Sequence, residues 1–227
     1  MPIDLGGYQL DNAYTAVREE YEVVGGRQTR AIQITGLLRG TGNLAALVEA
    51  LDNIAQAVSE TVPTEIVLRA GRRLFARRER FIREVSARAL VGQFVLALRA
   101  DDAWEESAAA NESSWNIGLS GATHEVWNGG NASAPLRISL GAESALVRPA
   151  VGDGERTLRY EGTVPNGAML VFDAALREVT LDGVDVTPYT SGEFPMVEPG
   201  EQVLIYSDDP ASGHLAVATV TFRDRWW

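Results

Sequence analysis

The stretch AIQITGLLRGTGNLAALVEAL, residues 31–51, decides the fold. Its first half is rich in aliphatic and β-branched residues and predicts a strand over about 29–38. Its second half opens a helix, predicted over 43–60, whose apolar residues recur at helical spacing. Asn43 or Thr41 can cap the start of this helix, and Pro63 prevents it from continuing. Between strand and helix, GTGNLA (40–45) fits the G-x-G-x-x-G/A pattern of a dinucleotide-binding turn.

The surrounding pattern argues against nucleotide binding. A dinucleotide-binding fold alternates strands with helices, whereas here one helical pattern is followed by strand after strand. Besides 29–38, strand-like runs cover 17–23, 65–69, 73–85 and 92–100. We therefore interpret the glycines of GTGNLA as a turn from strand to helix. Gly36, inside its strand, indicates a bulge or a close backbone approach.

The second half of the chain predicts only β structure. Short strand-like runs from about residue 113 onward alternate with Gly, Asn, Asp and Pro turn signals, such as Asp182-Gly183. The acidic run DDAWEESAAANESS (101–114) is typical of an interdomain connection or a long loop. The sequence thus predicts a mainly β protein with an α+β domain at 1–108 and an all-β sandwich domain at 109–227.

Composition excludes several classes of function. The net charge of -11 opposes a main role in gripping nucleic acid or an anionic membrane surface. The chain has no cysteine, no apolar run long enough for a membrane span and no secretory signal pattern at its start. Its two histidines, His124 and His214, are ninety residues apart without a patterned partner. We therefore predict no catalytic, cofactor-binding or metal-binding residues and no enzyme activity.

Eight arginines lie between residues 69 and 88, and all 20 basic residues of the chain are arginine. A strand alternates its faces, so these side chains divide between two sides and do not form one nucleic-acid surface. In an acidic protein they can pair with carboxylates of neighbouring subunits. We interpret them as subunit-interface or ordinary surface residues; the interface candidates are Arg72, Arg73, Arg77, Arg78 and Arg80.

The tryptophan residues allow two interpretations, glycan stacking or packing in cores and interfaces. A β-sandwich can present indole rings as platforms for sugar rings, and Trp115 and Trp127 are the candidates for glycan stacking. Tryptophan more often packs in cores and interfaces. Both readings stay open at the level of sequence.

The order of segments carries a resemblance. In the first half the matching segments are TRAIQITGLLRG (29–40), the helix 43–60, EIVLRAGRRLFAR (65–77) and FVLALRADDAW (94–104). In the second half they are WNGGNASAPLRISL (127–140), MLVFDAALREVTLDGVDV (169–186) and TVTFRDRWW (219–227). In this order and spacing the chain resembles the distal tail proteins of long-tailed phages, with relatives in prophages and gene transfer agents. No segment among them is a catalytic motif.

The resemblance implies a body plan and a role. Domain 1–108 would be a tail-tube-like split β-barrel or sandwich with one helix, and domain 109–227 a galectin-like β-sandwich. A hexameric ring of this structural protein would join the tail tube protein to the tail hub or tip protein, with DNA only in transit and no membrane partner. It would lie in the virion tail and be assembled in the host bacterial cytoplasm. The alternative is a carbohydrate-binding sandwich that contacts host surface glycans.

Overall fold

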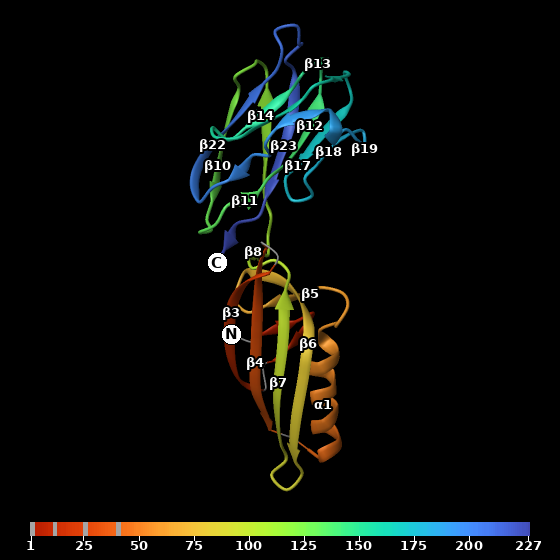
Figure 1. The fold of residues 1–227 in the computed structure, drawn as a ribbon, viewed down its shortest axis with the longest axis vertical. Coiled ribbons are helices and arrows are strands. Elements are labelled where there is room, and N and C mark those ends of the chain that lie inside the picture. Colours follow the sequence, from red (N-terminus) through yellow and green to blue (C-terminus); the bar gives the residue numbers. More distant parts are fainter. Residues whose placement is uncertain (1–2, 11–12, 25–26, 40–41) are drawn as a thin grey trace. The chain divides into compact units, whose positions relative to one another are not determined.

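A computed structural model describes residues 3–10, 13–24, 27–39 and 42–227. The chain divides into two compact units, Met1–Ala108 and Ala109–Trp227 (Figure 1). Both are built mainly of antiparallel strands, which confirms the predicted fold class. The glycine pair Gly25-Gly26 predicts a turn between the strands 17–23 and 29–38, but it lies outside the described residues, as does the start of GTGNLA with the candidate cap Thr41.

The first unit is built on one antiparallel sheet, in which β8 (Glu105–Ser107) also pairs with β6. Four of its strands are long and pair along most of their length (Figure 1). The strand order is β2 (Tyr8–Gln9), β1 (Asp4–Leu5), β5 (Thr64–Val67), β6 (Arg72–Ser86), β7 (Val91–Ala100), β4 (Arg27–Arg39) and β3 (Ala13–Val24).

Helix α1 (Leu44–Ala57) packs its apolar stripe on this sheet. The Asn43 side chain accepts a hydrogen bond from the backbone N–H of Ala46 at 2.9 Å, which confirms the predicted cap. Leu51 lies against Gly92 of β7, where an added Cβ would come within 2.9 Å of the leucine Cδ1. The described part of the chain contains no helix with the length and apolar character needed to cross a membrane.

The helix ends earlier than the predicted 43–60. Val58 is already extended, with φ -116° and ψ 122°. The Ser59 hydroxyl then accepts hydrogen bonds from the backbone N–H groups of Thr61 and Val62. This local turn offers the backbone an alternative to a further helical turn, as serine side chains commonly do.

Gly36 of β4 is explained by a close approach. The strand pairs regularly on both sides of Gly36, so no bulge interrupts it. A Cβ built on this residue would lie 2.3 Å from carbons of the Phe94 ring. The ring of Phe94 therefore occupies the space that any larger residue at position 36 would need.

The second unit consists of two main antiparallel sheets and two short strand pairs. One sheet has the order β10 (Thr123–Asn128), β22 (Gly200–Ser207), β14 (Ala150–Gly152), β15 (Thr157–Tyr160) and β20 (Thr190–Gly192). The other has the order β19 (Val184–Asp185), β18 (Glu178–Leu181), β17 (Met169–Asp173), β12 (Arg137–Ala142), β23 (Ala216–Phe222) and β9 (Asn111–Ile117). The short pairs are β11 (Ala134–Pro135) with β21 (Met196–Val197), and β13 (Leu146–Val147) with β16 (Thr163–Val164); a 3-10 turn, Thr187–Tyr189, and β24 (Arg225–Trp226) complete the unit.

The core of the second unit is one apolar cluster, to which both sheets contribute side chains. Leu140 and Phe172 enter it from one sheet, and Leu204 and Tyr206 from the other. The predicted hairpin at Asp182-Gly183 is confirmed: both residues have positive φ, 49° and 80°, and they join β18 to β19.

Part of the run 101–114 differs from the expected connection or long loop. It contains β8 and the first residues of β9. Glu105 is 1% exposed and takes part in buried ion pairs, which an exposed loop would not supply. In β9 Glu112, Ser114 and Asn116 lie on the outer face, while Trp115 and Ile117 enter the core.

Candidate interaction surfaces

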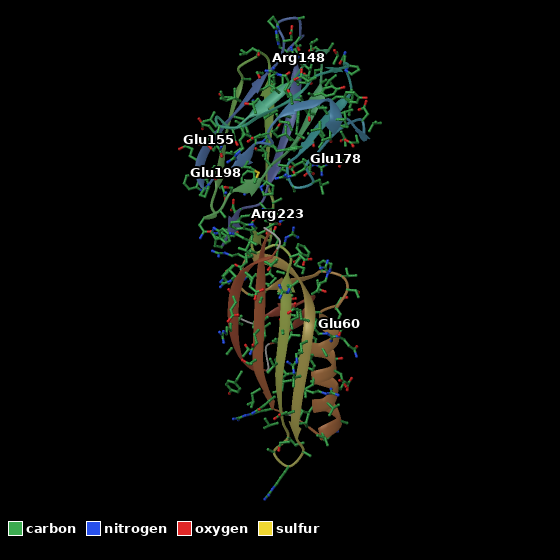
Figure 2. All side chains as sticks on the ribbon, viewed as in Figure 1. Glu60, Arg148, Glu155, Glu178, Glu198 and Arg223 are labelled. Atoms are coloured by element: carbon green, nitrogen blue, oxygen red, sulfur yellow. The ribbon has the colours of Figure 1, made fainter. Side chains whose placement is uncertain are left out.

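Five of the six arginines of β6 pair with carboxylates of their own unit in the described part of the chain. Arg73 lies 3.1 Å from Glu65 and 3.8 Å from Glu106. Arg78 lies 2.7 Å from Glu60, which follows α1 (Figure 2). The sequence suggested that these arginines pair with carboxylates of a neighbouring subunit. These internal ion pairs already neutralise part of their positive charge.

The remaining interface candidates are more varied. Arg77 pairs with Asp101 at the surface, and Arg72 lies 3.6 Å from Glu105. Arg80 follows an irregularity in the register of β6 and is exposed, and no ion pair described in the structure includes it. A role of these five arginines at a subunit interface stays a prediction.

A buried ion cluster lies around Arg30, whose side chain has no exposed surface. Its Nη2 is 2.6 Å from Glu19 Oε2 and 3.1 Å from Glu105 Oε1. Arg69 contacts the same two carboxylates. Burial alone would raise the pKa of Glu19, but the hydrogen bond from Arg69 and the charge of Arg30 lower it overall, so this carboxylate is ionised at neutral pH.

Sequence reasoning missed this cluster, although one signal pointed to it. Arg30 precedes Ile32 and Ile34 at a spacing of two, and strand alternation places all three on the same, inward face. A charged residue in phase with buried ones needs an ionic partner. The partner Glu105 is 75 residues away, so the sequence could not name it.

The opposite face of the same sheet is hollowed and partly apolar. A cavity of about 550 Å³ lies over β3, β4, β7 and β6. Its lining includes Tyr14, 72% exposed, and Ile82, 39% exposed, together with Leu37 and Val95. Leu37 and Val95 alternate along β4 and β7 with buried residues of the core that α1 covers. The first unit therefore leaves an apolar concavity outside its own core.

The two candidate tryptophans lie in different environments. Trp115 is 3% exposed; its ring stacks on His124 at 5.5 Å and meets Tyr206 edge-on at 6.5 Å. A buried indole has no free face for a sugar ring, so Trp115 is not available for stacking in this structure. Trp127 is 66% exposed on the outer face of β10, opposite Glu201 of β22.

Asp153 organises a polar network in the second unit. Its carboxylate accepts hydrogen bonds from the backbone N–H groups of Glu155, Arg156 and Met196 at 2.7–2.9 Å. The Arg156 guanidinium also donates a hydrogen bond to Glu198, at 2.9 Å. Burial raises the pKa of Asp153, but the backbone hydrogen bonds outweigh it and hold the pKa below its usual value. The network joins the turn after β14 to β21.

The two histidines lie against different partners. Ser113 Oγ is 2.7 Å from His124 Nε2, which links β9 to β10. His214 Nδ1 is 2.7 Å from Asp208, whose second oxygen accepts a hydrogen bond from Tyr206. Within the described ranges, no group of three or more His, Cys, Asp or Glu side chains could hold a metal ion.

Comparisons with known proteins agree with this picture. Residues 129–226 match the family model of the siphovirus-type tail component, C-terminal domain. The chain is similar to the solved structure of SPP1 Dit (gp 19.1), described as a paradigm of hub adsorption apparatus in phages that infect Gram-positive bacteria. The TM-score is 0.72 at 12% sequence identity, and the match covers 100% of this chain and 99% of that chain.

Two further comparisons add nothing to the argument. An exo-inulinase from Aspergillus awamori matches at a TM-score of 0.24 and 9% identity, covering 97% of this chain and 58% of that chain, and this score is too low to use. A search of curated proteins finds no match.

Residues 129–226 match the model of a siphovirus-type tail component, and the likeness to SPP1 Dit over the whole chain shows that the two proteins share a fold. Both findings confirm the resemblance to phage distal tail proteins that the sequence carries.

Proposed function

We propose that this chain forms a hexameric ring that joins the tail tube to the tail tip or baseplate hub and performs no catalysis. The observation that carries the proposal is the structural match to SPP1 Dit, which spans both units and nearly the whole of both chains. SPP1 Dit is described as a paradigm of hub adsorption apparatus, and we infer that a hub of this kind joins other tail proteins. The partners are then a tail tube protein, a tail hub or tip protein and further copies of this chain.

The apolar concavity of the first unit supports self-association. Tyr14, Ile82 and Val95 lie on a sheet face that α1 does not cover. Exposed apolar surface of this kind marks contact sites in proteins that assemble. A head-to-tail contact repeated by rotation closes into a ring. We propose that this face is covered in the assembled ring.

The acidic charge supports the passage of DNA through such a ring. Six copies carry a formal charge of 6 × -11 = -66. A negative channel lets a polyanion slide without binding, since tight binding would need clustered positive charge. The protein would act in the virion tail after assembly in the host bacterial cytoplasm.

The test is the size and shape of the purified protein. Six copies of the 24.5 kDa chain (6 × 24.5) form a particle of about 147 kDa. Light scattering coupled to gel filtration should give this mass, and negative-stain microscopy should show six-fold annuli. Monomers at every concentration tried would contradict the ring.

A pair of variants locates the contact. Ile82→Glu places a charge in the concavity without touching the core and should prevent ring formation. Leu176→Glu is the matched control, because Leu176 is 70% exposed in the turn between β17 and β18. If both variants form rings, the concavity is not the contact.

A further inference from the structure

The outer face of the strand pair β10–β22 combines apolar and acidic side chains. Trp127 is 66% exposed, and Val203 and Ile205 of β22 are 41% and 40% exposed. In the register of the two strands, Glu201 lies directly opposite Trp127, and Glu125 lies opposite Val203. These five residues, the Trp127 face, form one continuous surface on two paired strands.

The charges of the Trp127 face have no counterpart in the described part of the chain. None of the ion pairs there includes Glu125 or Glu201, and no arginine there lies over the Trp127 ring. The indole is the aromatic ring that best attracts a cation over its face. Two carboxylates beside it add to the negative potential at the same place. The surface is therefore complementary to a positive side chain.

The aliphatic residues indicate what kind of molecule carries this cation. Val203 and Ile205 can contact apolar groups but offer no hydrogen bonds to sugar hydroxyls. A glycan would leave these two side chains without a matching surface, whereas an extended polypeptide presents cationic and aliphatic side chains side by side. The composition of the face thus favours protein over carbohydrate.

We propose that the Trp127 face docks an extended basic segment of another tail protein, with an arginine or lysine over the Trp127 ring and aliphatic side chains against Val203 and Ile205. The inference rests on the proposed function only for the nature of the partner, a tail protein. It concerns a surface of the second unit that the ring contact proposed for the first unit does not use.

Isothermal titration calorimetry of the full chain with synthetic peptides tests the proposal. The probes are an acetylated hexapeptide of alternating arginine and valine and its counterpart of alternating glutamate and valine. We expect the basic peptide to bind, and its affinity to fall as salt is raised. Trp127→Ala should weaken this binding about tenfold, and the double variant Glu125→Gln/Glu201→Gln should remove most of its salt dependence. Leu176→Ala, which truncates an exposed apolar residue elsewhere in the unit, should bind as the wild type does.

Three outcomes would overturn the proposal. They are equal binding of the acidic peptide, no binding of the basic peptide, and an equal effect of Trp127→Ala and Leu176→Ala. Binding of a neutral oligosaccharide that is lost in Trp127→Ala would assign the face to glycans instead. Gel filtration of Trp127→Ala separates this test from the proposed function, because the ring should form unchanged when the docking is lost.

Discussion

The two units bury different kinds of side chain. The first buries the cation Arg30 with its carboxylate partners beside an apolar core, whereas the second has an apolar layer between two sheets and buries the carboxylate of Asp153. Geometry explains the difference. A 14-residue helix is about 21 Å long, while the 15-residue strand β6 extends roughly 50 Å. One helix cannot cover a sheet of such strands. The part of the inner face that α1 leaves uncovered is occupied by the charged side chains of the Arg30 cluster and by short strands. A sandwich covers itself with its second sheet.

The largest expected effect is on the helix contact. Leu51→Ala should destabilise the first unit by about 4 kcal/mol, because it removes a fully buried side chain that lies against Gly92. Hydrogen exchange followed by mass spectrometry should show faster exchange in 1–108 and unchanged exchange in 109–227. Equal acceleration in both ranges would mean that the units do not unfold independently.

A smaller loss is expected from the ion cluster. Arg30→Met should destabilise the first unit by about 3 kcal/mol, since Glu19 and Glu105 lose a buried partner. Chemical denaturation measures the effect. Arg83→Met is the control, because its pair with Asp52 lies at the surface and such pairs contribute about 0.5 kcal/mol. Equal effects of the two variants would show that burial does not distinguish the pairs.

The polar network of the second unit should respond to acid. Asp153→Asn should cost about 2 kcal/mol, because an amide cannot accept all the hydrogen bonds that the carboxylate accepts. The folded pKa of Asp153 is lowered from 3.8, so its contribution is fully present above that pH and is lost as pH falls through the folded pKa. Thermal unfolding measured from pH 7 downward should show the wild type to be more stable than the variant near neutral pH. This difference in stability should shrink as the pH falls through the folded pKa of Asp153. A constant difference would refute the assignment.

The smallest effect concerns the helix start. Asn43→Ala should destabilise the first unit by about 1 kcal/mol, because the N–H of Ala46 loses its acceptor. Asn43→Ser keeps an acceptor and should retain most of the stability. Urea denaturation of both variants measures the difference; identical midpoints would show that the cap contributes nothing.

Local patterns were enough to predict most of the fold. The strands of the first unit, the helix with its Asn43 cap and the Asp182-Gly183 hairpin depend on periodicity or on turn chemistry within a few residues. Strands β9 and β10 were harder, because serine, asparagine and glutamate occupy their outer faces and weaken the β signal.

The interaction surfaces depended on information that the sequence does not carry. In β10, Val126 and Trp127 are adjacent apolar residues, and alternation allows only one of them to face the core. In the register with β22, Val126 faces the core and is 7% exposed, and Trp127 faces outward. On β9 the reverse holds, because Trp115 faces the core and is 3% exposed. Partners distant in the chain, such as Glu105 for Arg30, are likewise fixed only by the folded sheet.

The contact between Ser113 and His124 affects how readily the edges of the two sheets can pair with other chains. It joins β9 and β10, each of which is the last strand of its sheet. Terminal strands that gather at high local density tend to zip together into fibres. Here the two ends are tied to each other, and Glu112 and Glu125 repel incoming copies. These two strand edges should therefore resist pairing with the edges of other chains.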